Sequence, residues 1–338
     1  MEDLKKKNVE IEIILTFFSP SGYEIRKNYA LANVFYLPAD LPGNARKWIA
    51  SINPDLAVFV KYDLWPGYLH ALISKHIPFL LMSAHFRPGT LSSWSIPPTS
   101  YLLKKAKVIF LQDGNWIEDL NRKGFENIKV AGDTRIDRTL EIANETKEQI
   151  SKLKFQFGTF DLVAGSTWEE DEDILLPVIE KLKLKVIIAP HDIRESHLHK
   201  LMQRIHVPAA RLSTITKLDD SIQVLVVDSI GQLAYLYALG KIAYIGGGFG
   251  KGIHNILEPA AHHLPVIFGP RYHKFPEAEK LIQLQAAISV NDQSAFQDAI
   301  TLFSGEEGKL AGDRAFSFLE KNCGATPIIS SYIREFIS

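Results

Sequence analysis

Short apolar runs alternate with amphipathic segments along the whole chain. A first series, rich in β-branched and aromatic residues, lies at Ile11 to Phe18, Val34 to Leu37, Leu56 to Tyr62, Phe79 to Ser83, Val108 to Gln112 and Ile128 to Ala131. A second series lies at Leu162 to Gly165, Val186 to Ala189, Val224 to Val227, Ile242 to Ile245, Val266 to Phe268 and Ala287 to Val290. Strands that alternate with helices pair in parallel, with helices on both faces of the sheet. Each series therefore predicts one doubly wound α/β domain.

The domain boundaries follow from the segment that separates the two series. Residues 135–158 are polar and helix-prone and lack strand character, so we expect them to connect a first domain, 1–134, to a second, 159–325. A last amphipathic segment, 326–338, follows the second sheet and is expected to cross back to the first domain. Two such domains facing each other would form a central cleft, lined by the carboxyl ends of their strands, where open α/β sheets bind ligands.

A glycine-rich loop follows the predicted strand that ends at Ile245. Five glycines there lack the side chains that would keep a ligand away from backbone N–H groups: Gly246, Gly247, Gly248, Gly250 and Gly252. Pro259 suits the first position of a helix, so we expect a helix to open near Glu258 with its positive dipole end facing the loop. The pattern predicts a phosphate site, and a purely structural tight turn is the alternative.

Two polar residues next to this loop suit a nucleotide. Asn255 could donate to a phosphate or hold the loop, and Glu258 could accept hydrogen bonds from both hydroxyls of a ribose. Neither the early G-x-G-x-x-G of dinucleotide-binding folds nor a P-loop occurs in the chain. We interpret the loop as a nucleotide site of another kind.

Other polar residues follow neighbouring strands of the second domain. We expect a hydroxyl of Ser166 or Thr167 to cap the helix that begins in the acidic run after them, and Ser166 could also touch the nucleotide. His191 could be a hydrogen-bond donor or cation in the cleft, or stabilise its loop. The basic cluster at Arg271, His273 and Lys274 suits a carboxylated or phosphorylated ligand, or is a solvated loop.

No metal site and no cofactor are predicted. Asp171 and Asp173 match the D-x-D of metal-dependent sugar transferases only superficially, because carboxylates in the first turn of a helix already complement its dipole. The histidine spacings, such as that of His197 and His199, fit no familiar zinc signature.

In the first domain, two predicted strand ends carry candidates for an acceptor-binding surface. Ser19 and Ser21 follow the first strand as possible helix caps, and Lys61, Asp63 and Trp65 follow the third. Ordinary polarity at strand ends is the alternative interpretation, and a core position is the alternative for Trp65.

Composition narrows the classes of partner. The chain has 38 Lys and Arg against 39 Asp and Glu, so no overall field would attract nucleic acid. A single cysteine, Cys323, excludes an intrachain disulfide framework and suits a reducing cytosol. No apolar run approaches the ~20 residues that span a bilayer, so we expect no transmembrane segment in this chain.

The motifs taken together resemble a known enzyme family. They are Phe17-Phe-Ser-Pro-Ser-Gly22, Leu64-Trp-Pro66, Ala164-Gly-Ser-Thr167, Gly246-Gly-Gly-Phe249, His254-Asn-Ile-Leu-Glu-Pro-Ala260 and Pro265-Val-Ile-Phe-Gly-Pro270. With them the chain resembles the 3-deoxy-D-manno-octulosonate (Kdo) transferases of lipopolysaccharide synthesis. The resemblance implies a GT-B architecture of two Rossmann-like domains and metal-independent, inverting transfer of Kdo from CMP-Kdo to a lipid A precursor. It also implies a peripheral location at the cytoplasmic face of the inner membrane.

The resemblance also assigns site residues. The donor contacts that it implies, together with the strand-end candidates above, are Ser166, Thr167, His191, Gly247, Gly248, Phe249, His254, Asn255, Glu258, His273 and Lys274. Two motifs depart from the family pattern. Pro190-His191-Asp192 stands where many members have Pro-Arg-His, and Lys61-Tyr62-Asp63 stands where many have Glu-x-Glu.

A third departure concerns the start of the chain. Family members carry an upstream strand and a Gly-Glu turn whose glutamate is the proposed base, so no catalytic residue is assigned here. We expect a first domain of lower stability, with exposed apolar surface and an unpaired sheet edge, and poor sugar transfer. Two alternatives stay open: a UDP-sugar 2-epimerase of the same architecture, and a nucleotide-binding protein without catalysis.

Overall fold

The chain divides into two compact units. The computed structural model describes all residues except 8–9, 62, 86–96, 220 and 338. One unit comprises Met1–Asp137 with Asn322–Ser338, and the other comprises Arg138–Lys321. Residues 135–158, expected as a connection, form two helices, and from Arg138 onward they belong to the second unit.

The first unit alternates strands and helices as expected. Its elements are α1 (Glu2–Lys7), β1 (Ile14–Phe17), α2 (Pro20–Arg26), β2 (Asn33–Tyr36), α3 (Pro42–Ile52), β3 (Ala57–Val60), α4 (Pro66–Ser74), β4 (Phe79–Ala84), α6 (Pro97–Leu103), β5 (Val108–Leu111), α7 (Ile117–Arg122), β6 (Ile128–Val130) and α17 (Ala325–Ile337). Tyr62, expected within the third strand, lies outside the described residues.

These strands form two sheets instead of the single one expected. β3, β4, β5 and β6 pair in parallel in that order, and β1 pairs in parallel with β2 alone. In the described part of the chain β4 is the only strand that pairs with β3. Val58 and Val60 of β3 are 40% and 46% exposed. The apolar pattern located the strands, but the pairing of one strand with another depends on long-range packing that this pattern does not encode.

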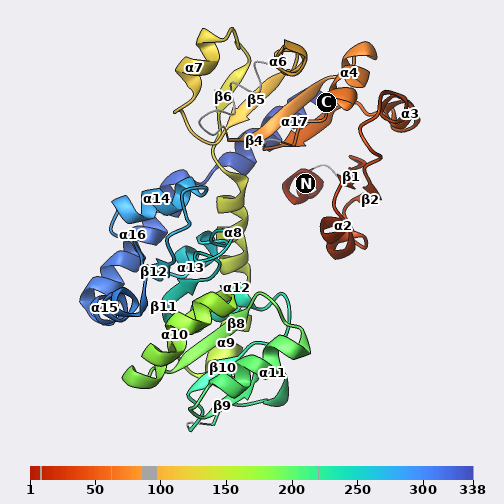
Figure 1. The fold of residues 1–338 in the computed structure, drawn as a ribbon. Coiled ribbons are helices and arrows are strands. Elements are labelled where there is room, and N and C mark those ends of the chain that lie inside the picture. Colours follow the sequence, from red (N-terminus) through yellow and green to blue (C-terminus); the bar gives the residue numbers. More distant parts are fainter. Residues whose placement is uncertain (8–9, 62, 86–96, 220, 338) are drawn as a thin grey trace. The chain divides into compact units, whose positions relative to one another are not determined.

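Helices cover both faces of the four-stranded sheet. Leu81, Ile109 and Leu111 face a core shared with α3, α4, α6 and α7. The opposite face, with Leu80 and Phe110, packs against α17 and against Leu4 of α1. The C-terminal helix therefore belongs to the first unit, although it follows the whole of the second unit in the sequence (Figure 1).

One carboxylate joins the two points where the chain passes between the units. Asp137 lies in α8 (Thr134–Glu145). It is the last residue of the first unit before the chain enters the second. Its Oδ1 accepts a hydrogen bond from Gly324 N at 2.6 Å, and its Oδ2 accepts one from Thr326 N at 3.0 Å. These donors lie at the start of α17, where the first turn of a helix leaves N–H groups unpaired.

The second unit is a doubly wound domain. After α8 its elements are α9 (Lys147–Phe157), β7 (Phe160–Thr167), α10 (Glu169–Leu182), β8 (Val186–Pro190), α11 (Glu195–Arg204), β9 (Ala209–Arg211), β10 (Val224–Val226), α12 (Leu233–Leu236), β11 (Gly240–Ile245), α13 (Leu257–Ala261), β12 (Val266–Phe268), α14 (Pro276–Gln283), β13 (Ala287–Ser289), α15 (Gln293–Phe303) and α16 (Glu306–Asn322). Two short 3₁₀ turns, Leu212–Thr214 and Tyr237–Leu239, complete it.

The sheet of the second unit places its first strand in the middle. All seven strands are parallel, in the order β13-β12-β11-β7-β8-β10-β9. The chain runs outward from β7 through β8 on one side and later through β11 on the other. Strand order reverses at such a point, and the crevice at the carboxyl ends of the strands is where open α/β sheets bind ligands. The short strand β9 was not predicted.

Candidate nucleotide site at the centre of the second sheet

The glycine loop begins where β7 and β11 end side by side. Gly165 pairs with Ile245, and Gly246 N donates to Gly165 O at 2.9 Å. A Cβ on Gly246 would lie 2.2 Å from Ser166 O, and one on Gly248 would lie 2.6 Å from the backbone of Gly269. Both glycines are therefore required by close backbone packing, whether or not a ligand binds beside them.

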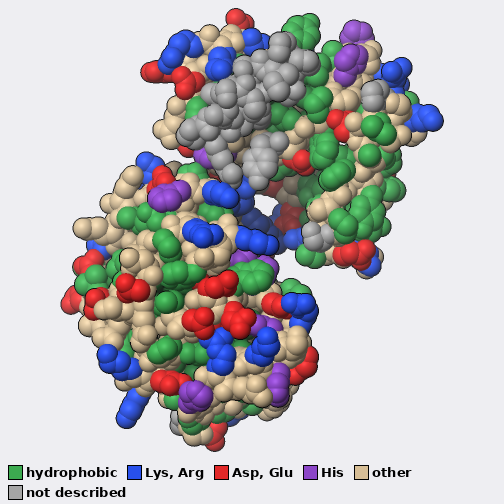
Figure 2. Space-filling view, in the orientation of Figure 1, with side chains coloured by type: hydrophobic (Ala, Val, Ile, Leu, Met, Phe, Trp, Pro, Cys, Tyr) green, Lys and Arg blue, Asp and Glu red, His purple; other side chains and the backbone are tan. Residues whose placement is uncertain are grey.

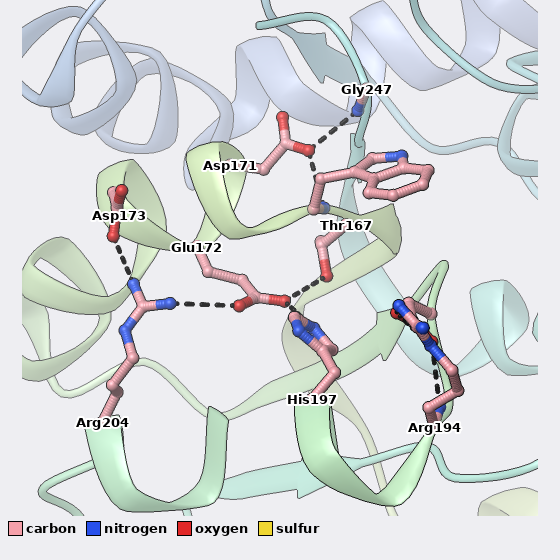
Figure 3. A network of polar contacts seen from close by, with 10 residues as sticks. Thr167, Asp171, Glu172, Asp173, Arg194, His197, Arg204 and Gly247 are labelled. Carbon is pink, nitrogen blue, oxygen red and sulfur yellow. Dashed lines mark hydrogen bonds and ion pairs between the residues drawn. The ribbon is translucent and has the colours of Figure 1, made fainter. Parts of the chain in front are cut away.

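A buried aspartate fixes the loop to helix α10. Asp171 is fully buried, and its Oδ2 accepts hydrogen bonds from Gly247 N at 2.8 Å and Trp168 N at 2.9 Å. Its Oδ1 accepts one from the hydroxyl of Tyr244 at 2.7 Å. Figure 3 shows the carboxylate between helix and loop. The Gly247 amide, expected to face an anion, is thus engaged inside the protein, which corrects that expectation.

Two other amides of the loop make no hydrogen bond. Within the part of the chain that the structure describes, neither Gly248 N nor Phe249 N donates to a protein acceptor; Gly248 is buried and Phe249 is half-buried. The loop is closed from behind by Arg271, whose Nη1 donates to Gly250 O at 2.6 Å and whose N donates to Gly248 O at 2.9 Å. A basic side chain expected to contact the ligand therefore braces the loop instead.

The helix after the loop is shorter than expected. α13 spans Leu257–Ala261 and begins close to Glu258, as predicted, but Pro259 is its third residue and not its first. Five residues align few peptide dipoles, so this helix contributes less to anion binding than we expected. Asn255 holds the loop: its Oδ1 accepts from Leu257 N at 3.1 Å and its Nδ2 donates to Glu258 Oε1 at 2.8 Å.

Glu258 lines a small pocket within the second unit. The other lining residues are Thr139, Ile142, Ala143, Ala234 and His262. Burial raises the pKa of Glu258, and the hydrogen bond from Asn255 lowers it by less. Burial also lowers the pKa of His262, which contacts Ala234 O at 2.8 Å. A carboxylate in such apolar surroundings gains from hydroxyl donors, as the predicted ribose contact requires.

Three rings stack at the ends of β7, β8 and β11. Trp168 and His191 have ring centroids 4.6 Å apart, and His191 and His254 have centroids 4.5 Å apart. The interplanar angles are 25° and 24°. His191 is exposed, while Trp168 and His254 are half-buried. Two of the three histidines predicted as donor contacts, His191 and His254, therefore lie together, and Trp168 is an unpredicted third member of the stack.

Ser166 and Thr167, the two hydroxyl residues at the end of β7, differ in how far they are buried. Ser166 is half-buried and has φ of 55°, a left-handed conformation that costs free energy for a residue other than glycine. Thr167 is fully buried, and its hydroxyl donates to Glu172 Oε1 at 3.3 Å. The expected hydroxyl cap is therefore wrong: the N-cap of α10 is Trp168, and the side chain of Asp171 closes the turn.

The acidic run supports the structure and gathers no metal ligands. Glu172 is fully buried and contacts His197 at 3.1 Å and Arg204 at 3.3 Å, and Arg204 also pairs with Asp173 (Figure 3). Burial raises the pKa of Glu172, while His197 and Arg204 act in the opposite direction. Among the described residues no group of three potential ligands forms a metal site.

The remaining basic candidates lie on the surface. His273 and Lys274 are exposed, and His273 Nδ1 is 3.4 Å from Glu279 Oε1. Asp192, next to His191, forms an ion pair with Arg194, whose hydrogen bonds hold the pKa of Asp192 well below its usual range. The ion pair keeps Arg194 beside Asp192.

The acceptor-side candidates lie in the first unit. Ser19 caps α2, accepting a hydrogen bond from Gly22 N at 3.4 Å, and the side chain of Ser21 is outside the described set. Lys61 has φ of 58° at the end of β3, and Asp63 is exposed in the turn after it. Trp65 packs on the core and lies 4.7 Å from the ring of Phe18. The packing of Trp65 matches the alternative of a core position, and an acceptor surface at these two strand ends stays a prediction.

Sequence reasoning missed the parts that connect these residues. Asp171 closes the turn by accepting from Trp168 N, but Trp168 lacks the acceptor oxygen of a usual capping residue, so the sequence carried no capping-box signal here. The hydrogen bonds of Asp171 to Tyr244 and Gly247 cross more than 70 positions of sequence and have no local signal. The contact of Trp168 with His254 is equally distant.

A membrane-spanning helix is not found. Of the helices that the structure describes, none combines the length and the apolar character needed to cross a bilayer.

Comparisons with known proteins bear on both units. A family model described as 3-deoxy-D-manno-octulosonic-acid transferase (kdotransferase) matches residues 1–138. A 3-deoxy-D-manno-octulosonic acid transferase of Haemophilus influenzae is 26% identical over 356 residues, covering 100% of this chain and 83% of that protein. The enzyme of the same name from Aquifex aeolicus is 28% identical over 295 residues, covering 84% of this chain and 76% of its own length.

Solved structures establish the fold class. The UDP-GlcNAc 2-epimerase of Neisseria meningitidis aligns with a TM-score of 0.66 over 99% of this chain and 94% of that one, at 16% identity. At this identity the likeness shows the GT-B fold alone and gives no support to the epimerase alternative. The family model matches the first unit, and the relatives named Kdo transferases align over most of both units, so the chain is similar to the Kdo transferases, which are glycosyltransferases.

Proposed function

We propose that this chain transfers Kdo from CMP-Kdo to a lipid A precursor, with inversion at the sugar and without a metal ion. The observation that carries the proposal is the loop at the centre of the second sheet. Its amides at Gly248 and Phe249 make no hydrogen bond within the described part of the chain, and the half-buried Glu258 follows the loop at the start of α13. That combination suits the phosphate and the ribose of one nucleotide. Relatives named for Kdo transfer support the choice of sugar.

The reaction needs charge stabilisation at the leaving group. An acceptor hydroxyl attacks the anomeric carbon of Kdo, the bond from that carbon to the CMP phosphate oxygen breaks, and CMP departs with the bonding electrons. The hydroxyl proton passes to a base. Amide donors aimed at the phosphate stabilise the charge that develops on it, as a metal ion does in other transferases. We assign the donor contacts to Gly248, Phe249, His254 and Glu258, with Ser166 beside them.

A lipid acceptor requires contact with a membrane, and we propose peripheral attachment to the inner membrane through the first unit. Large apolar side chains are exposed there at Phe18, Ile25 and Leu41, which are 56%, 76% and 59% exposed. Figure 2 shows hydrophobic side chains gathered on this part of the molecule, with Lys and Arg near them. Apolar side chains beside basic ones favour binding to anionic lipid surfaces.

Ligand-dependent melting tests the donor. We expect CMP, and not UDP at the same concentration, to raise the melting temperature, because a ligand that binds only the folded state stabilises it. Glu258→Gln should weaken this protection, and Glu126→Gln, at an exposed position of the first unit, is the control. Protection by UDP alone would support the epimerase alternative and contradict the proposal.

A transfer assay tests the reaction. Radiolabelled CMP-Kdo and a lipid A precursor are incubated with the protein in EDTA, and the lipid product is separated by chromatography. The proposal expects labelled lipid in EDTA. Label that enters lipid only after a divalent ion is added would refute metal independence, and absence of labelled lipid under both conditions would refute the transfer itself.

A further inference from the structure

The contact between Trp168 and His254 determines where the imidazole carries its proton. Trp168 Nε1 lies 3.2 Å from His254 Nε2. An indole N–H can only donate, so Nε2 of His254 accepts and carries no proton. A neutral imidazole with a bare Nε2 has its proton on Nδ1. Burial, and to a smaller extent the neighbouring His191, lowers the pKa of His254 and favours the neutral ring.

The orientation of the ring places that proton on the side away from Gly247. A Cβ on Gly247 would lie 3.1 Å from His254 Cδ2 and 3.3 Å from Nε2, so this edge of the imidazole faces Gly247. Nδ1 is the ring atom opposite the Cδ2–Nε2 bond. Within the described residues, no group accepts a hydrogen bond from Nδ1. The ring therefore presents one N–H donor that a ligand could use.

Stacking keeps the imidazole in this orientation. Trp168 and His254 are joined edge to edge by their hydrogen bond, and each lies within 25° of parallel to the ring of His191. Trp168 is itself fixed, because its backbone N donates to the buried Asp171. Asp171 also receives the Gly247 amide, so the same carboxylate sets the position of the ring pair relative to the loop.

We propose that Trp168 is a positioning residue of the donor site, which holds His254 as the Nδ1–H tautomer so that a neutral imidazole donates to the phosphate of the bound nucleotide. The inference rests on the proposed function, because it assumes that a nucleotide phosphate binds at the glycine loop. Without the indole N–H, the imidazole is free to place its proton on Nε2 and leave a bare acceptor at Nδ1. An acceptor would repel a phosphate oxygen.

Nuclear magnetic resonance of the unliganded protein tests the tautomer directly. Imidazole ¹⁵N shifts and their long-range proton couplings distinguish the two neutral tautomers. We expect the Nδ1–H form for His254 in the unmodified chain and loss of this preference in Trp168→Phe, which keeps an aromatic ring against His191 but lacks the N–H. Trp116→Phe, in the first unit, is the matched control and should leave the His254 signals unchanged. An Nε2–H tautomer in the unmodified chain would overturn the inference even if the variant failed to fold.

A double-mutant cycle tests whether Trp168 acts through His254. CMP affinity is measured by calorimetry for Trp168→Phe, His254→Phe and the double variant. One hydrogen bond to a charged phosphate oxygen corresponds to a loss on the order of tenfold for His254→Phe, and we expect a loss of roughly threefold to tenfold for Trp168→Phe. The double variant should bind no more weakly than His254→Phe, because coupled residues are not additive.

The outcomes separate this inference from the proposed function. If the unmodified chain binds CMP but the two losses add, or Trp168→Phe binds normally, Trp168 does not act through His254 and the inference is wrong. If the unmodified chain does not bind CMP, the proposed function fails, and the role of His254 toward a phosphate fails with it.

Discussion

At the scale of single residues, the candidate site depends on polar side chains that hydrogen-bond to the protein backbone and not to a ligand. Asp171, Asn255 and Arg271 all hold the glycine loop. All three had been considered as ligand contacts or within a metal motif, because a polar residue near a strand end suggests function when its internal partners are unknown. The glycines and Glu258 could be recognised from the sequence. The partners of Asp171 and Trp168 could not, because they lie far away along the chain.

Replacement of Asp171 tests its role as the link between helix and loop. We expect Asp171→Ala to destabilise the second unit by about 1–3 kcal/mol or more, because three donors lose a buried acceptor. Urea unfolding measures the free energy. Glu170→Gln, an exposed position of the same helical turn, should cost less than ~1 kcal/mol. Equal losses for both variants would show that Asp171 is only one more charge at the start of the helix.

The raised pKa of Glu258 predicts a pH dependence of stability. A carboxyl whose pKa is higher in the folded than in the unfolded state binds its proton more tightly when folded, so its contribution to stability falls as pH rises above its usual pKa. We therefore expect Glu258→Gln to gain stability relative to the unmodified chain between pH 4.5 and pH 7.5. Urea unfolding at both pH values measures the difference. A relative gain at the lower pH instead would mean that the pKa is lowered by folding.

At the scale of elements, the periodic pattern located strands better than it located sheets. Most predicted strands lie within a few residues of the observed ones, because β-branched runs bounded by turn residues are a local signal. The short strand β9 carries the sequence Ala-Ala-Arg and has no such signal. The separation of β1 and β2 from β3 also escaped prediction, since any strand of a parallel sheet is buried and apolar in the same way.

The edge of β3 is expected to make the first unit prone to self-association. A strand that pairs on one side only can pair with another chain on the other, and the exposed valines 58 and 60 favour such contact. Val58→Lys with Val60→Lys should reduce aggregation, as measured by light scattering at matched concentration. Ile230→Lys, at an exposed position of the second unit, is the control. Equal scattering from all three proteins would contradict a role for the β3 edge.

At the scale of the whole molecule, each unit carries its own candidate surface. The loop, the ring stack and the Glu258 pocket lie entirely within residues 138–321, and the apolar surface proposed for lipid lies in the other unit. Two-unit organisation was predictable because a change in strand series marks it. The unit to which residues 135–158 belong was harder to predict, since a polar helix has the same sequence pattern whether it connects two domains or belongs to one.

Binding to lipid vesicles is expected to depend on the first unit and not on the second. Ile25→Glu should reduce co-sedimentation with vesicles that contain anionic lipid, because it places a charge on the proposed membrane surface. Ile25 is 76% exposed, and Ile230, in the second unit, is 84% exposed. Ile230→Glu is therefore a closely matched control that should bind as the unmodified chain does. Equal binding by both variants would place the membrane surface elsewhere.

The hydrogen bonds of Asp137 have a practical consequence for the architecture. Because this carboxylate touches the backbone at Gly324 and Thr326, the two ends of the segment 138–321 emerge next to each other. That segment is inserted into the sequence of the first unit at one place. Its removal would leave only a short distance between the two remaining chain ends. Adjacent ends are the condition under which inserted domains can be transplanted or circularly permuted. The second unit is thus suited to production as an independent module.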